Sequence, residues 1–312
     1  MPMPAEFHEL AKKVNNWGRW GPDDEVGTIN FVTPDVRRAA AACVKTGKAF
    51  SLALPLSQTE GIQTGVIPGR INPLRTMVAI NAPMLGDPSQ FCTSDDVVVM
   101  GLQAGTHWDG LGHVSYDGRL YNGNPASSIT EWGAAKCGIH KIRTLVTRGV
   151  LLDVARVKGV DCLEGGYPIT ADDLDAACEM GNVTVKSGDV VLLRTGQMAK
   201  YLGGPARDLA AYGAPASGPS TQTVEWFHSH EVAAVATDNL TFEVFPCERD
   251  DMILPVHLLH LVEMGMTQGQ NWVLDDLAAD CADDGVYEFL LDASPQPFTN
   301  AVGSPVNPVA VK

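Results

Sequence analysis

The chain has 312 residues, of which 45% are hydrophobic and 19% charged, a composition typical of a folded globular protein rather than a disordered one. Its formal net charge of −15 at pH 7 opposes attraction to nucleic-acid phosphates and to anionic membrane surfaces. We therefore expect no nucleic-acid partner and no membrane partner.

Short apolar segments predict the strands of a sheet. In chain order they are residues 50–56, 77–80, 96–102, 149–154, 189–194, 233–237 and 287–291. Several of them are apolar at consecutive positions, which is typical of strands that are covered on both faces. The pattern indicates a sheet that is largely buried.

Helical patterns lie between these strands. Thr33 and Pro34 begin a helix that Gly47 would end, and Thr170 caps a helix over 171–180. Further helices are predicted over 220–228, 255–265 and 274–282. The alternation, without an internal repeat, predicts a single α/β domain over 1–312 with a mixed sheet flanked by helices. Within it we expect an N-terminal arm and helix (1–48) and a catalytic core (49–312).

The seven cysteines are scattered and include no C-x-x-C spacing. An odd, unpatterned set in a chain of this length favours reduced thiols and a cytoplasmic location. No stretch of eighteen apolar residues predicts a membrane span, and the first residues lack the basic and apolar regions of a secretory signal. The alternative is a secreted protein whose signal has been removed.

The segment QAGTHWDGLGH, from Gln103 to His113, concentrates the residues that carry chemistry. It follows the predicted strand 96–102, and ligand sites of α/β proteins tend to lie at strand ends. His107 and Asp109 are two residues apart and point the same way in an extended segment. One imidazole and one carboxylate in this arrangement, with His113 nearby, predict a metal site or a catalytic site. For any one of these residues alone, the alternative is a structural role in a loop.

These residues also resemble a known family. The run from Gly105 to Asp109, followed by His113, resembles the signature H-x-G-T-H-x-D-x-x-x-H of the cyclase family, which includes bacterial kynurenine formamidases and isatin hydrolases. Further segments similar to its longer bacterial members lie at 17–24, 27–30, 121–123, 188–196 and 303–308. The resemblance implies a swivelling β/β/α domain, a homodimer or homotetramer, and hydrolysis of C–N bonds in amides, often cyclic, with Zn²⁺ or Mn²⁺.

The resemblance also implies roles for individual residues. The family's first two signature histidines and its aspartate hold the metal, and these positions are Gln103, His107 and Asp109 here. The last histidine of the signature serves as the acid/base, which makes His113 the predicted catalytic residue. The chain thus departs from the family at Gln103, where a neutral amide replaces an imidazole.

In formamidases the same aspartate joins a later histidine and glutamate in a second metal position. The corresponding residues here are Asp109, His257 and Gln270, so that a second amide replaces a carboxylate. Because amide oxygens are weaker ligands for Zn²⁺, each position keeps only two strong donors. We therefore expect one divalent ion, Mn²⁺ or Zn²⁺, rather than two, with a metal-free site as the alternative. For His257, which lies on an apolar segment, a structural role is the alternative.

The predicted function is metal-dependent hydrolysis of a small cyclic amide, imide or lactone, with His113 moving the proton. Tyr121 and Arg194 are predicted to bind the substrate by analogy with their place after strands, with structural roles as the alternative. The loops 61–73 and 203–219 are expected to form the pocket walls. Because of the two glutamines, a metal-free lyase or dehydratase and a non-catalytic small-molecule-binding protein remain as alternatives. The sequence contains no nucleophile elbow and no glycine-rich phosphate loop.

Overall fold

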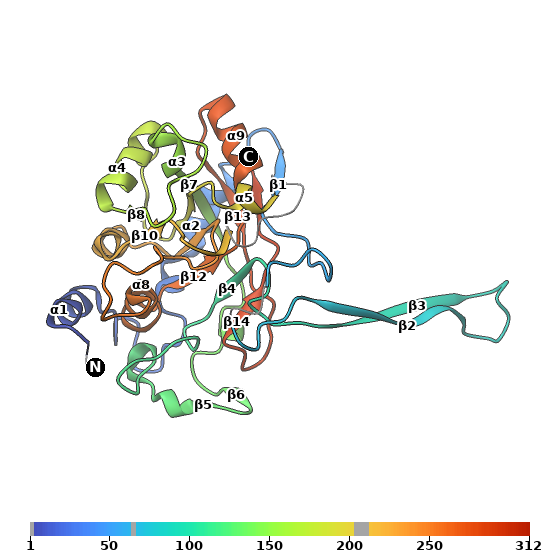
Figure 1. The fold of residues 1–312 in the computed structure, drawn as a ribbon. Helices are drawn as coiled ribbons and strands as arrows, with labels where there is room; N and C mark the ends of the chain where they lie inside the picture. The colour runs from blue at the N-terminus through green and yellow to red at the C-terminus, as the bar shows by residue number, and fades with distance from the viewer. Residues whose placement is uncertain (1–2, 64–66, 203–211) are drawn as a thin grey trace.

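The computed structural model describes residues 3–63, 67–202 and 212–312, and a nine-stranded mixed sheet organises them (Figure 1). The strand order is β1-β15-β13-β7-β9-β11-β12-β4-β14. The parallel strands at its centre are β7 (Val146–Asp153), β9 (Val190–Arg194), β11 (Ala234–Thr237) and β12 (Thr267–Gln270). Antiparallel strands flank them: β1 (Ala49–Ser51), β15 (Val309–Val311) and β13 (Glu288–Asp292) at one end, β4 (His107–Asp109) and β14 (Gly303–Pro305) at the other.

Helices cover both faces of this sheet, as expected for consecutive apolar strand residues. One face packs against the following elements: α1 (Ala5–Val14), α3 (Val154–Val157), α4 (Ala171–Met180), α7 (Val224–Ser229), α8 (Pro255–His257) and the π-helix η6 (Leu258–Met264). The other face packs against α9 (Asp275–Asp284) and the 3-10 helix η1 (Gly27–Phe31). Alternation along β7 sends Val150 to the first core and Leu151 to the second. The predicted mixed, buried sheet flanked by helices is therefore confirmed.

Shorter elements complete the chain. The helices are α2 (Pro34–Ala41), α5 (Met198–Leu202), η2 (Tyr121–Gly123), η3 (Ala126–Ser128), η4 (Ile139–Lys141) and η5 (Thr221–Thr223). The remaining strands form three small sheets, which pair β8 (Pro168–Ile169) with β10 (Gly218–Pro219), β5 (Ile129–Thr130) with β6 (Gly133–Ala134), and β2 (Leu74–Pro83) with β3 (Cys92–Val99).

The predicted helix caps are present. The side chain of Thr170 accepts the Asp173 N–H, and the Asp173 carboxylate accepts the Thr170 N–H, which completes a capping box at α4. The Thr33 side chain caps α2 by accepting the Val36 N–H alone, and α2 ends at Ala41 rather than near Gly47. The reason is tertiary, because the N–H of Gly47 donates to the carbonyl of Lys312 at the C-terminal strand.

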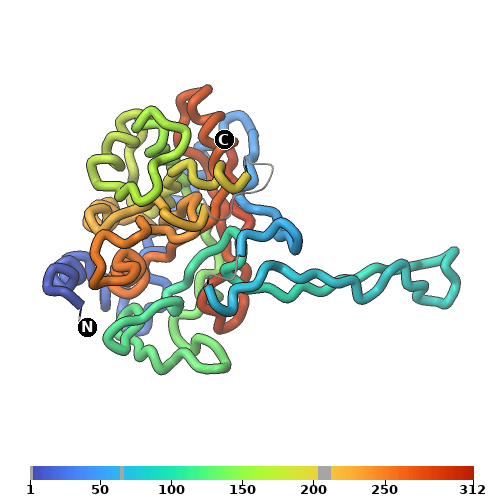
Figure 2. The backbone as a smooth tube through the Cα atoms, viewed as in Figure 1, coloured from blue at the N-terminus to red at the C-terminus, as the bar shows by residue number. Residues whose placement is uncertain are grey.

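The predicted strand 96–102 exists as β3, but its expected burial is wrong. β3 pairs with β2 in a long hairpin that projects from the body of the molecule (Figures 1 and 2). Its apolar side chains are exposed, with 58% of Val99 accessible. A β-branched run is typical of a strand, but it does not distinguish a covered strand from an isolated ribbon. The motif does not follow a strand of the main sheet. It forms one itself, which is β4.

Within the described ranges, no helix is long and apolar enough to cross a membrane. All seven cysteines are free thiols.

Candidate active site

The site lies on the sheet face that β4 and β12 share. In their antiparallel register, His107 is opposite Gln270 and Asp109 is opposite Gln268. Directly opposed residues project to the same side of a sheet, so four polar side chains gather there, and all four are buried. Trp108 projects to the opposite face, where it packs edge-on against another tryptophan in the core.

Backbone contacts fix the direction of the His107 ring. The Thr106 hydroxyl donates to the carbonyl of Asn271, and the Asn271 side-chain amide donates to the carbonyl of Gly105 at 3.0 Å. The same Gly105 oxygen lies 2.7 Å from Nδ1 of His107. Because a carbonyl oxygen only accepts, Nδ1 carries the hydrogen and Nε2 of the neutral ring presents a lone pair. The His107 tautomer is thus set by its own loop.

Two acceptors without a shared hydrogen face each other at the centre of the site. Nε2 of His107 lies 3.5 Å from Oδ1 of Asp109, and neither atom has a hydrogen-bond partner among the described residues. Buried polar atoms are nearly always satisfied, so this pair requires a cation or a proton between or beside the two atoms. His113 lies on the solvent side, with Nε2 3.6 Å from the same carboxylate oxygen and 20% of its side chain exposed.

A second group of contacts extends from the other carboxylate oxygen. Nε2 of Gln270 donates to Oδ2 of Asp109 at 2.7 Å and lies 3.3 Å from Nε2 of His257. The Glu243 carboxylate lies 2.5 Å from Nδ1 of His257 and accepts the backbone N–H groups of Val256 and His257. His257 therefore donates from Nδ1 to Glu243, and its Nε2 is free to accept from Gln270. The amide nitrogen of Gln270 bridges Asp109 and His257.

The charges favour an ionised aspartate beside a neutral histidine. Burial alone would raise the pKa of Asp109, but His113 and His107 outweigh it and hold this pKa far below its usual range. Burial lowers the pKa of His113, the Asp109 carboxylate opposes this shift, and the charges of His257 and Arg70 add to it. His113 is therefore neutral near pH 7 and able to accept a proton.

Gln103 reaches the same face through β14. Gly303 of β14 is paired with Asp109 of β4, so a side chain at position 303 would stand beside the Asp109 side chain. Nε2 of Gln103 lies 2.5 Å from the point where a Cβ on Gly303 would be. The absence of a side chain at Gly303 therefore makes room for the Gln103 amide next to Asp109.

The structure does not bring Tyr121 into this cluster. Its hydroxyl donates to Asp24 at 3.0 Å, and its ring lies against the backbone of Gly265. The ring is fully buried in a small apolar core that joins η2 to η6. These contacts give Tyr121 a structural role, and its substrate contact stays a prediction that no contact supports.

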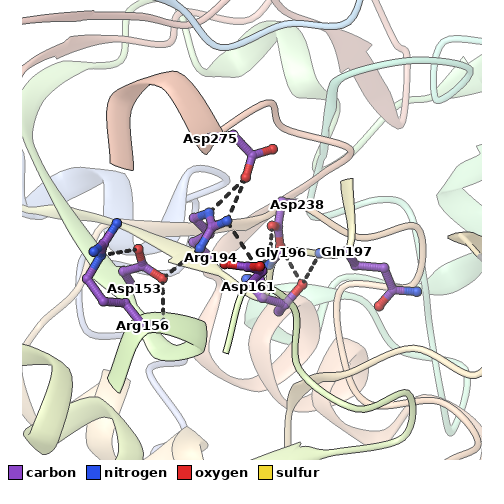
Figure 3. Close-up of polar contacts among 9 residues, drawn as sticks. Asp153, Arg156, Asp161, Arg194, Gly196, Gln197, Asp238 and Asp275 are labelled. Carbon is purple, nitrogen blue, oxygen red and sulfur yellow. Dashed lines mark hydrogen bonds and ion pairs between the residues drawn. The ribbon is translucent and has the colours of Figure 1, made fainter. Parts of the chain in front are cut away.

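Arg194 lies at the end of β9, which β11 and β12 separate from β4. Its guanidinium donates to Asp275 at 2.9 Å, to Asp153 at 3.0 Å and to the carbonyl of Asp161 at 3.2 Å (Figure 3). These contacts tie β7, β9 and α9 together at one end of the sheet. Arg194 therefore has a structural role here, and its predicted substrate contact is likewise not supported.

Four residues of the site were not predicted. They are Glu243 beside His257, Gln268 beside Asp109, Arg70 near the hairpin, and His260 in η6, whose pKa burial lowers to about 3. Gln268 had a signal, because it stands two residues before Gln270 and a strand places such residues on one face. Glu243 had none, since only the folded chain brings it to His257.

Across the described ranges, no group of three or more His, Cys, Asp or Glu side chains is arranged to hold a metal ion. His257, one of the three strong donors expected, stands beyond the Gln270 amide and does not join His107 directly. An ion at His107 and Asp109 would therefore need amide oxygens as well. Parts of the expected pocket walls, residues 64–66 and 203–211, lie outside the described residues.

The fold and this motif define a family. Residues 16–244 match the family model described as "Putative cyclase". The chain therefore belongs to the cyclase family. A crystal structure described as a novel cyclase is 40% identical to it, with 96% of this chain and 100% of that chain covered and a TM-score of 0.87.

More distant structures share the fold. Isatin hydrolase A from Ralstonia solanacearum is 20% identical, with 90% of this chain and 98% of that chain covered and a TM-score of 0.63. Isatin hydrolase A from Labrenzia aggregata, bound to benzyl benzoate, is 17% identical, with 87% and 94% covered and a TM-score of 0.61. At these identities the likeness concerns the fold alone. None of the curated proteins compared with the chain matches it.

Proposed function

We propose that the protein is a metal-dependent hydrolase that opens a small cyclic amide, imide or lactone. The observation that carries this proposal is the pair of buried acceptors, Nε2 of His107 and Oδ1 of Asp109, which face each other at 3.5 Å. The fold shared with structures named isatin hydrolases supports the hydrolase class and a cyclic substrate.

The donor set fits one divalent ion. His107 and Asp109 supply the strong donors, and Oε1 of Gln270 is a third buried acceptor that has no partner in the described part of the chain. Gln103 stands beside Asp109 and would add an amide oxygen. A set dominated by oxygen suits Mn²⁺ as well as Zn²⁺. The Gln270 amide nitrogen lies between Asp109 and His257, which argues against a second ion there.

A bound divalent ion would polarise the substrate carbonyl and lower the pKa of water. His113, neutral at pH 7, takes the proton of the attacking water and returns it to the leaving nitrogen or oxygen. The Asp109 carboxylate, 3.6 Å away, stabilises the protonated form of His113 while the proton is held. The positive charge of Arg70 acts on both Asp109 and His113. The same charge stabilises the carboxylate that ring opening of the substrate produces.

Assays on a panel of cyclic amides, imides and lactones test the proposal. We expect hydrolysis that exhaustive chelation abolishes and that Mn²⁺ or Zn²⁺ restores. Asp109→Asn should abolish turnover even with added metal, whereas Asp161→Asn, which leaves the site untouched, should not. Turnover that survives chelation would contradict the proposal.

One observation favours the alternative functions. The Gln270 amide nitrogen contacts both Asp109 and His257, so hydrogen bonds of the amide can hold these two side chains together. A metal-free lyase or dehydratase would retain activity after chelation. A non-catalytic binding protein would turn over none of the panel while still binding one of its members.

The cytoplasm is the proposed location. All seven cysteines are free thiols, and reducing compartments keep thiols in this state.

A further inference from the structure

Arg70 lies in the segment before β2 and carries a charge that its surroundings do not match. Its side chain is half-buried, and its guanidinium has neither an ion pair nor a hydrogen bond in the part of the chain that the structure describes. Burial lowers the pKa of Arg70, and the attraction of Asp109 does not offset this shift. By contrast, the buried guanidinium groups of Arg148 and Arg194 each pair with two carboxylates. Because a buried charge without a partner costs free energy, Arg70 has the environment of a residue that binds an anion.

Backbone contacts hold Arg70 beside the motif that forms the site. Its Cα atom lies 3.6 Å from the point where a Cβ on Gly101, just before the motif, would be. The N–H of Gly101 donates to the carbonyl of Ile71 at 3.3 Å. The side-chain amide of Gln63 donates to the carbonyl of Ala104 at 3.1 Å and ties an earlier part of the same loop to the motif. Neighbouring contacts therefore fix the backbone of Arg70, which leaves its guanidinium available to a ligand.

The charge of Arg70 acts on the two residues that the proposed reaction uses. It attracts the Asp109 carboxylate, and it adds to the effect of burial, which lowers the pKa of His113. At −15 the whole chain repels anionic ligands, but physiological salt screens exposed charges beyond about 8–10 Å. A cation next to the reacting groups can therefore select an anionic substrate that the distant charges do not exclude.

We infer that Arg70 is a specificity-determining residue that binds a carboxylate substituent of the substrate. This inference rests on the proposed function, and it narrows the substrate to a cyclic amide, imide or lactone that is already anionic when it binds. The guanidinium offers parallel N–H donors that match the two oxygens of a carboxylate. A carboxylate that forms only on ring opening would leave Arg70 unpaired in the complex with the substrate, whereas a substituent pairs with it throughout the reaction.

Paired substrates test the inference. Each pair consists of a cyclic amide, imide or lactone that carries a carboxylate and the same ring with a carboxamide in its place. The ratio of kcat/KM within a pair is the measured quantity, because any effect of Arg70 on ring opening itself is common to both members and cancels. We expect the wild type to prefer the carboxylate member by about 10- to 100-fold. Arg70→Gln should lose this preference, mainly through a higher KM for the carboxylate member.

The matched control is Arg75→Gln. Arg75 is an exposed arginine of β2 that lies 3.5 Å from Asp96, and its replacement should keep the wild-type preference. Equal kcat/KM for the two members in the wild type would overturn the inference, as would a preference that Arg70→Gln retains.

Calorimetry with the ring-opened products of the same pairs separates this inference from the proposed function, because the chain cannot turn these compounds over. The wild type and Arg75→Gln should bind the product with the extra carboxylate at least about 10-fold more tightly than the carboxamide product, and Arg70→Gln should bind both alike. If no ring is opened but this difference in binding is present, the proposed function fails and the anion site stands. Equal binding of the two products by the wild type, or no binding of any carboxylate member, would overturn the inference.

Discussion

Nε2 of His107 faces Oδ1 of Asp109 across 3.5 Å inside the protein, and the hydrogen of the imidazole points away to the carbonyl of Gly105. Two lone pairs thus meet in a region without water access, which costs free energy unless a positive charge compensates. The β4–β12 register brings Gln270 to the same place from the neighbouring strand. The proposed chemistry follows from this pair more than from any other contact.

His113→Ala should lower kcat by a factor on the order of 10² to 10⁴, because it removes the neutral base whose Nε2 lies 3.6 Å from Asp109. Its metal content should stay at the wild-type value, since His113 is not among the proposed ligands. Steady-state kinetics and elemental analysis on the same sample measure both. His8→Ala is the matched control, and equal activity of the two variants would exclude the acid/base role.

Gln270→Glu should bind more metal than the wild type. The new carboxylate would replace the amide that bridges Asp109 and His257, so that three strong donors surround the position. Without metal, two buried like charges should lower the free energy of unfolding by on the order of 3 kcal/mol. Metal titration followed by thermal denaturation measures both effects. If Gln270→Glu binds no more metal per chain than Gln270→Ala does, this interpretation of Gln270 is contradicted.

Glu243→Gln should weaken metal binding by roughly 10-fold, although Glu243 is no proposed ligand. The carboxylate fixes His257, which in turn accepts from Gln270 and so fixes the carboxylate of Asp109. The amide of this variant keeps one acceptor oxygen but loses the negative charge that holds Nδ1 of His257. Competition titration with a chromophoric chelator gives the affinity, and Glu131→Gln is the surface control. An unchanged affinity would show that this chain of contacts does not reach the metal position.

The contribution of Asp238 to the free energy of unfolding should decrease between pH 4 and pH 7. Burial raises the pKa of this carboxyl group to about 6 from 3.8, although it accepts the N–H and hydroxyl of Thr195 and the N–H of Gly196 (Figure 3). The folded state therefore holds the proton more tightly than the unfolded state. The resulting stabilisation is fully present below about pH 4 and is lost as the pH rises through 6.

Denaturant unfolding of the wild type and of Asp238→Asn at several pH values measures this loss. From pH 4 to pH 7, the free energy of unfolding of the wild type should fall by about 3 kcal/mol relative to that of Asp238→Asn. A difference that is constant, or that changes in favour of the wild type, would contradict the raised pKa.

The centre of the fold could be predicted because its signals are local. The runs in β7, β9 and β11 are apolar at consecutive positions, and the capping residues of α4 are adjacent in sequence. The hairpin could not be placed, because Val97 and Val98 have the same pattern in a covered strand and in an exposed ribbon. Which faces are covered depends on the rest of the chain.

As with the fold, the part of the site that is local in sequence could be predicted, and the part that distant residues form could not. His107, Asp109 and His113 lie within seven residues, and their common environment follows from an extended segment. Glu243 enters only because the folded chain carries it to the start of α8, fourteen positions before His257. Arg194 follows a strand, as a substrate-binding residue often does, but neighbouring aspartates engage its guanidinium.

Elemental analysis of the chain purified without added metal tests the central claim most directly, with Asp109→Asn as the paired sample. We expect about one equivalent of Mn²⁺ or Zn²⁺ in the wild type and close to none in the variant, because the variant loses the charge that opposes the His107 lone pair. A wild-type chain that contains no metal, and that takes up neither Mn²⁺ nor Zn²⁺ on titration, would contradict the account.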